Sequence, residues 1–154
     1  QVEAANKVGF TALMLASQDG HQGVVEALLR AGAQVEAANK VGFTALMLAS
    51  QDGHQGVVEA LLRAGAQVEA ANKRGATALM LAALKGHRGV VEALLRAGAQ
   101  TEAADDEGFT ALSIAALKGH RGVVEVLLRA GAQTEAADDE GFTALSIAAL
   151  KGHR

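Results

Sequence analysis

A 33-residue repeat constrains this chain more than any other feature of its sequence. Residues 1–33 and 34–66 are identical, residues 67–99 differ from them at six positions, and residues 100–132 keep the same frame. The last segment, residues 133–154, is identical to residues 100–121. Repeats of this length form small structural units that stack side by side. We therefore expect one elongated domain over residues 1–154, with four full units and a partial fifth.

Each unit contains a turn followed by two short helical segments. Residues 2–9 are rich in Asn and Gly, so they predict an extended turn, which we call the tip of the unit. Thr11 is placed to cap a first helix over residues 12–19, which Gly20 ends. A second helix over residues 22–31, ended by Gly32, has its apolar residues on one face. The first helix is apolar nearly all round, so neighbouring units must bury it in an all-α solenoid.

The frame of each unit resembles the ankyrin repeat. In the first unit the matching segments are Gly9–Leu13, Gly20–His21, Val24–Leu29 and Gly32–Ala33. The resemblance covers the whole chain and implies an α-solenoid of helix-turn-helix units with β-turn tips. Two segments depart from the family's usual sequence. Thr-Ala-Leu-Met or Thr-Ala-Leu-Ser stands where the family usually has Thr-Pro-Leu-His, and Val-Glu-Ala or Thr-Glu-Ala stands where it has Val-Asn-Ala. The Asn that asparaginyl hydroxylases modify in such repeats is therefore absent.

The composition excludes several classes of protein. The chain has no Cys, which removes disulfide frameworks, thiolate metal sites and cysteine nucleophiles. Its formal net charge is −3 without a stripe of Lys and Arg, so we expect no nucleic-acid partner. No apolar run approaches the roughly 20 residues that a membrane helix needs, and the first residues do not resemble a secretory signal. We expect an intracellular, cytoplasmic protein that does not interact with membranes.

The polar side chains do not form a catalytic or metal-binding pattern. One His occurs per unit, about 8–10 Å from the next if units pack like neighbouring helices, which is too far to share a metal ion. We expect these rings to bond to backbone in the turn between the helices. The Ser residues of the first helices have no base near them in sequence, and no Gly-rich loop follows a strand. We therefore expect no enzymatic activity, no cofactor and no metal. The residues concerned are His21, His54, His87, His120 and His153, and Ser17, Ser50, Ser113 and Ser146.

Charged residues recur in rows along the stack. On the second helices Glu26 and Arg30 recur in each full unit with i,i+4 spacing, which predicts an exposed ridge of ion pairs worth about 0.3 kcal/mol each. The tips change from basic (Lys7, Lys40, Lys73, Arg74) to acidic (Asp105, Asp106, Glu107, Asp138, Asp139, Glu140). The ends of the first helices change the other way, from Asp19 and Asp52 to Lys85, Lys118 and Lys151. These opposed rows either pair with each other or form a bipolar docking surface.

An aromatic residue follows the tip glycine in every unit except the third. The four residues are Phe10, Phe43, Phe109 and Phe142, and Ala76 takes their place in unit three. The rings either cover the base of the turn or serve as anchors for a partner. In either case, unit three has a gap where its neighbours carry a ring.

The differences between units point to a binding surface. Most of the changes from unit one to unit three lie at the tip and the end of the first helix, positions that in the ankyrin family line the concave side and hold partners. The resemblance thus implies a non-catalytic module for a protein or peptide, centred where basic unit three meets acidic unit four. The candidate residues are Lys73, Arg74, Ala76, Leu84, Lys85, Asp106, Glu107, Phe109, Leu117 and Lys118, with the leucines exposed. Neutral change at exposed positions is the alternative explanation.

Two other functions are compatible with the repeat. Identical outer units are typical of an engineered or duplication-derived scaffold without a partner of its own. A stack without polar capping repeats can also associate end to end. The fifth unit ends before its second helix, which would leave its first helix, residues 144–151, incompletely covered. We expect a monomer with weak end-to-end association.

Overall fold

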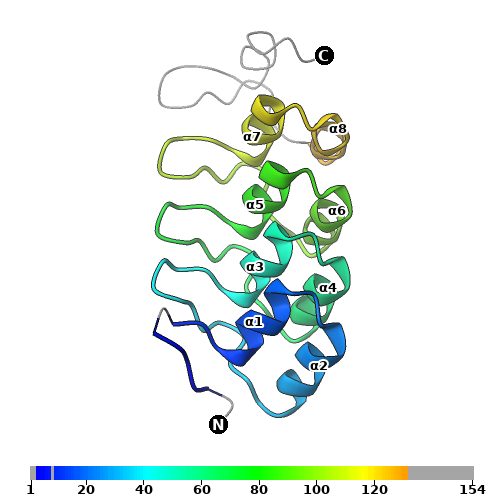
Figure 1. Cartoon of the computed structure of the whole chain (residues 1–154). Coiled ribbons are helices and arrows are strands. Elements are labelled where there is room, and N and C mark those ends of the chain that lie inside the picture. The colour runs from blue at the N-terminus through cyan, green and yellow to red at the C-terminus, as the bar shows by residue number, and fades with distance from the viewer. Residues whose placement is uncertain (1–2, 8, 132–154) are drawn as a thin grey trace.

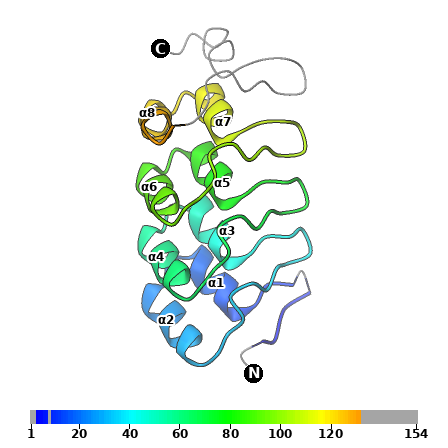
Figure 2. The same ribbon diagram turned by 180° about the vertical axis from the view of Figure 1, so that it is seen from behind.

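The computed structural model describes residues 3–7 and 9–131, and this part of the chain forms four stacked pairs of antiparallel helices (Figure 1). The first helices form one column and the second helices another, and the tips project from the first column, as Figure 2 shows from behind. The predicted all-α solenoid is confirmed. The helices are α1 (Ala12–Gln18), α2 (Gln22–Arg30), α3 (Ala45–Gln51), α4 (Gln55–Arg63), α5 (Ala78–Lys85), α6 (Arg88–Arg96), α7 (Ala111–Lys118) and α8 (Arg121–Arg129).

The helix expected at residues 144–151 lies outside the described residues, and so do Phe142, Ser146 and His153. The assignment of residues 1–154 to one domain therefore stays a prediction.

The first helices begin and end close to the predicted residues. Thr11 caps α1, because its Oγ1 accepts a hydrogen bond from the backbone N–H of Met14 at 3.3 Å. Gly20 follows the helix with φ +77°, the left-handed conformation that suits glycine. The helix ends one residue earlier than predicted, at Gln18, whereas α5 continues to Lys85. A lysine is favourable at the negative end of the helix dipole, and the aspartate at the equivalent position of α1 is not.

The second helices end in a glycine motif, as predicted. Gly32 has φ +90° after α2. The backbone N–H of Ala33 donates to the carbonyl of Leu28 at 3.0 Å, and that of Gly32 donates to Leu29 at 3.1 Å. These two bonds satisfy carbonyls that the helix itself leaves without partners. The helix ends at Arg30, one residue before the predicted end.

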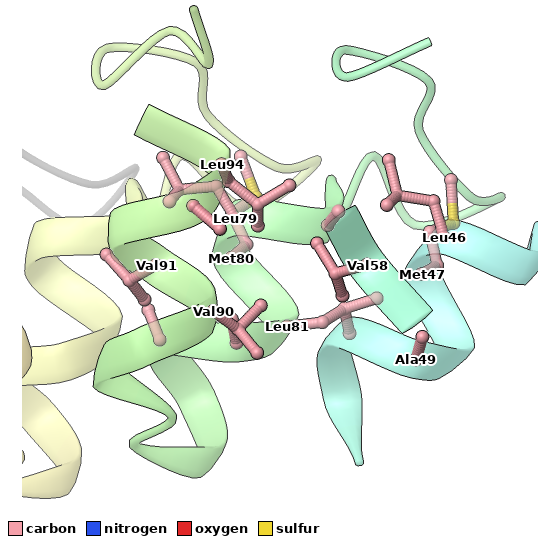
Figure 3. Close-up of a cluster of buried hydrophobic side chains, with 14 of the residues drawn as sticks. Leu46, Met47, Ala49, Val58, Leu79, Met80, Leu81, Val90, Val91 and Leu94 are labelled. Atoms are coloured by element: carbon pink, nitrogen blue, oxygen red, sulfur yellow. The ribbon is translucent and has the colours of Figure 1, made fainter. Parts of the chain in front are cut away.

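Stacking buries the first helices on all sides in the middle of the solenoid. Every residue of α3 from Ala45 to Ser50 is buried, and so is every residue of α5 from Ala78 to Ala83. Figure 3 shows how side chains of these helices meet those of α4 and α6, among them Leu46, Met47, Val58, Leu79, Met80, Val90 and Leu94. Burial of this kind is the main force that holds neighbouring units together.

The outer side of the first helix pair shows what a missing neighbour changes. Leu15 in α1 is 44% exposed, whereas its equivalent Leu48 in α3 is 5% exposed. Val24 in α2 is 52% exposed, whereas Val57 in α4 is 1% exposed. The two units have the same sequence, so this difference comes only from their positions in the stack.

Histidine side chains join each unit to the preceding one. The Nε2 atom of His87 lies 2.9 Å from the carbonyl oxygen of Gln51, the last residue of α3. Because a carbonyl only accepts, Nε2 must carry the hydrogen. His54 and His120 make the same bond, to Gln18 and Leu84. The predicted backbone bond is confirmed for these three rings, with its acceptor in the neighbouring unit.

A glutamate in each Val-Glu-Ala segment makes a second link between units. The backbone N–H of Gln67 donates to Glu36 Oε2 at 2.7 Å, and that of Gln100 donates to Glu69 Oε2 at 2.7 Å. The glutamates that replace the family's usual asparagine therefore hold the start of the following unit.

The ion pairs of the second helices differ from the predicted ones. Glu26 pairs with Arg63 of the next unit at 3.8 Å and not with Arg30, because α2 and α4 pack side by side. Glu59 pairs likewise with Arg96 at 3.6 Å, while the i,i+4 pairs within helices are Arg88–Glu92 and Arg121–Glu125. The ridge is exposed, as predicted, but the predicted partners are wrong.

Candidate functional site

The tip of unit three is a hairpin-like turn organised by Asn72. Ala71 and Thr77 form an isolated β-bridge at its base. Asn72 donates its backbone N–H to the carbonyl of Ala76 at 2.9 Å. Its Oδ1 accepts from the backbone N–H of Arg74 at 2.9 Å and of Ala76 at 3.0 Å. One side chain therefore shapes the whole tip.

Aspartate performs the same task in unit four. Asp105 Oδ1 accepts from the backbone N–H of Glu107 at 2.9 Å and of Phe109 at 3.0 Å. The acidic tip keeps the fold of the basic tip because an aspartate oxygen can accept the same bonds as an asparagine oxygen. One carboxylate of the acidic tip is therefore engaged by backbone, while Asp106 and Glu107 remain exposed.

Backbone hydrogen bonds hold neighbouring tips in register. The N–H of Lys73 donates to the carbonyl of Val41 at 3.2 Å, and the N–H of Asp106 donates to the carbonyl of Arg74 at 2.9 Å. The tips approach closely, since a Cβ atom at Gly75 would lie 3.0 Å from the nitrogen of Asp106. The tips thus form a continuous wall, and the charged side chains of units three and four are exposed along it.

A groove of about 720 Å³ lies between this wall and the first helices. We call it the unit-three groove, because residues of α5 and of the unit-three tip lie at its centre. Its apolar side chains are Val41, Phe43, Ala76, Met80, Leu81, Leu84 and Ile114. Its polar and charged side chains are Gln51, Asn72, Lys73, Arg74, Asp105, Asp106 and Glu107. The groove therefore combines an apolar floor with charges of both signs.

The space in the groove coincides with the missing aromatic ring of unit three. Phe43, the equivalent of Ala76 in unit two, is half-buried, packs against the core and lines the groove. Ala76 also packs against the core but has no ring. Phe43 thus packs against the core and also lines the open groove, so both interpretations of the phenylalanines stay open.

Six of the ten residues predicted from sequence line the unit-three groove: Lys73, Arg74, Ala76, Leu84, Asp106 and Glu107. The other four, Lys85, Phe109, Leu117 and Lys118, do not line it. Leu84 and Leu117 are half-buried and not exposed as expected. Whether any of the ten contacts a partner stays a prediction.

The groove also contains residues that the sequence analysis missed. These are Val41, Phe43, Gln51, Asn72, Met80, Leu81, Asp105 and Ile114. The groove spans three units, whereas the ten residues predicted from the sequence come from units three and four. The repeat offered a signal for two of them, because Val41 and Phe43 are equivalent, one unit away, to the predicted Arg74 and Ala76.

The opposed charges of tips and helix ends do not pair with each other in residues 3–7 and 9–131. The ion pairs there all involve second helices. The first of the two interpretations of these rows is therefore wrong for this part of the chain. Lys85 and Lys118 are exposed at the ends of α5 and α7.

The described residues offer little support for other kinds of site. They contain no cluster of three or more His, Cys, Asp or Glu side chains that could hold a metal ion. None of their helices is long and apolar enough to cross a membrane. Two hydroxyl groups, those of Ser17 and Ser50, are buried without a hydrogen-bond partner, and neither lies in the groove.

Comparison with known families identifies the frame of the repeat. A family profile described as "Ankyrin repeats (3 copies)" matches residues 1–72 and 79–154. Comparison with curated proteins gave no match. The two matched segments together span nearly the whole sequence, and the stacked helix pairs with projecting tips agree with them. The chain belongs to the ankyrin repeat family.

Proposed function

We propose that this chain is a non-catalytic module that binds a protein or peptide on its concave face, between the tips and the first helices. Ankyrin repeats generally serve as protein–protein interaction modules and are typically non-catalytic. The finer statement, that this chain holds its partner in the unit-three groove, rests on the geometry of that groove.

The proposal rests on one observation: the unit-three groove combines open space, apolar side chains and charged side chains that form no ion pair. Among the described residues, Lys73, Arg74, Asp106 and Glu107 take part in no ion pair. On the opposite side of the molecule, the glutamates of α2 and α4 are already paired with arginines of the next unit. A partner therefore gains more from the charges of the groove than from those of the ridge.

Charge reversal tests this proposal. The partner is first captured from an extract on the immobilised chain, and its affinity is then measured by calorimetry at several salt concentrations. Lys73→Glu combined with Arg74→Glu should weaken binding by about 2 kcal/mol, or roughly 30-fold, with the fold intact. Arg30→Glu is the control, because it reverses the charge of an exposed residue that lies outside the groove and is not among the ten candidates. An affinity that falls with Arg96→Glu on the ridge, and not with the double change, contradicts the proposal.

We also propose a weak self-association through the outer side of α1 and α2. The exposed Leu15 and Val24 are equivalent to Leu48 and Val57, which α1 and α2 of the preceding identical unit cover. A second copy carries helix pairs of the same kind, which supports contact between copies at this surface. Sedimentation velocity should show association that rises with protein concentration and is lost in a Leu15→Gln, Val24→Gln variant. Sedimentation as a monomer at every concentration would contradict this second proposal.

A further inference from the structure

We propose that the unit-three groove selects an extended peptide segment with one large apolar side chain between an acidic and a basic residue. The apolar side chain fills the space beside Ala76, the acidic residue faces the tip of unit three, and the basic residue faces the tip of unit four. This inference rests on the proposed protein-binding function and names the class of partner that the groove fits.

The apolar part of the inference follows from the missing ring. Phe43 and Ala76 are equivalent residues of units two and three and both line the groove, but Ala76 has no ring to fill the space beside it. The apolar surface that a partner side chain can contact comes from the partly buried Phe43, Ala76, Leu84 and Ile114, since Met80 and Leu81 beneath it are almost fully buried. Aromatic and large aliphatic side chains gain the most from such a site, because they bury the largest apolar area.

The charged part follows from the order of the tips. Lys73 and Arg74 lie on one tip of the groove wall, and Asp106 and Glu107 lie on the next. The backbone bond between Asp106 and Arg74 fixes this order. A segment that runs along the wall in the matching direction meets a complementary charge on both tips, and a segment with reversed charges meets repulsion on both.

The spacing of the charges in the partner follows from the spacing of the units. Helices of neighbouring units pack about 8–10 Å apart, and an extended segment rises about 3.3 Å per residue. The acidic and basic residues should therefore lie about two or three positions apart, with the large apolar residue between them.

The preceding junction lacks both features of this site. Unit two has Phe43 in place of the alanine, and the turn residues Asn39–Val41 and Asn72–Arg74 at that junction include no acidic residue. The pair of features occurs together where unit three meets unit four. A single segment should therefore find one preferred register on the stack.

The experiment is a selection from a displayed library of random dodecapeptides on the whole chain, followed by fluorescence anisotropy with the selected peptides. We expect peptides with the stated pattern, which lose at least tenfold in affinity when their large residue is replaced by Ala or their charges are exchanged. Ala76→Phe should weaken them at least tenfold as well. This variant keeps the fold because phenylalanine occupies the equivalent position in neighbouring units. Circular dichroism checks the fold, and Ala76→Leu is a second filling variant.

The controls separate this inference from the proposed function. Ala97→Phe places the same ring on an exposed residue outside the groove and should leave the affinity unchanged. The inference is wrong if the selected peptides bind the Ala76→Phe and Ala76→Leu variants with unchanged affinity but lose affinity with Lys73→Glu and Arg74→Glu. The proposed function would still stand in that case. A library without binders, or binders insensitive to all these changes, overturns both.

Discussion

Removal of a histidine ring should loosen the junction between two units. The Nε2–H of His87 donates to the carbonyl of Gln51 at 2.9 Å. Gln51 is the last residue of α3, so its carbonyl has no partner within the helix. The ring also packs directly on Gly53, since a Cβ atom there would lie 2.7 Å from two of its ring atoms. His87→Ala therefore removes a hydrogen bond and a packing contact, both between units two and three.

The size of the effect follows from these two losses. A net hydrogen bond contributes about 0.5–1.5 kcal/mol, and the lost contact of a half-buried ring adds to it. We expect His87→Ala to lower the free energy of unfolding by about 1–2 kcal/mol. With a urea dependence of about 2 kcal/mol per molar, the midpoint of unfolding falls by roughly 0.5–1 M, which circular dichroism resolves easily.

The chain provides its own matched control. His21 is the equivalent residue of unit one, but its ring is exposed, and no described residue forms a hydrogen bond with it. His21→Ala should change the free energy of unfolding by less than about 0.5 kcal/mol. His87→Gln should restore part of the loss, because its amide N–H can reach the same carbonyl. If His21→Ala is as destabilising as His87→Ala, the ring acts within its own unit and the reasoning is wrong.

Three further predictions concern stability and use denaturant midpoints. Gly65→Val should lower the free energy of unfolding by about 1–2 kcal/mol, and Lys40→Ala by less than about 0.5 kcal/mol. Gly65 has φ +91° and open space around it, so the valine introduces backbone strain without a steric clash. Equal stability of the two variants would contradict the left-handed helix end. Ser50→Ala should raise the free energy of unfolding by about 1 kcal/mol, because it removes a buried hydroxyl group that has no hydrogen-bond partner. A lower free energy of unfolding would show that the hydroxyl group forms a hydrogen bond. A double-mutant cycle on Arg63 and Glu26 should give a coupling below about 1 kcal/mol that weakens with salt, whereas a larger, salt-independent value would refute the exposed geometry.

Features that depend on neighbouring residues could be predicted from the sequence. The cap at Thr11 and the helix end at Gly32 require only a few residues of chain, and the structure confirms both. The repeat itself dictates the stack, because a single unit cannot bury its own apolar surface. The hydrogen bonds from the histidine rings to the backbone could also be predicted. A ring that recurs once per unit has backbone groups of the turn around it as its nearest hydrogen-bond partners.

Features that depend on how one unit sits on the next were decided by the tertiary structure. Sequence spacing placed Glu26 opposite Arg30, but Arg63 of the adjacent helix lies closer once the units are stacked. The same holds for the groove, whose lining residues come from three units and include Val41 and Ile114, far apart in the chain. The 33-residue period of the sequence gives the number and order of the units. Their relative offset and rotation come from side-chain packing across the whole interface, and these decide which charges pair and which space remains open.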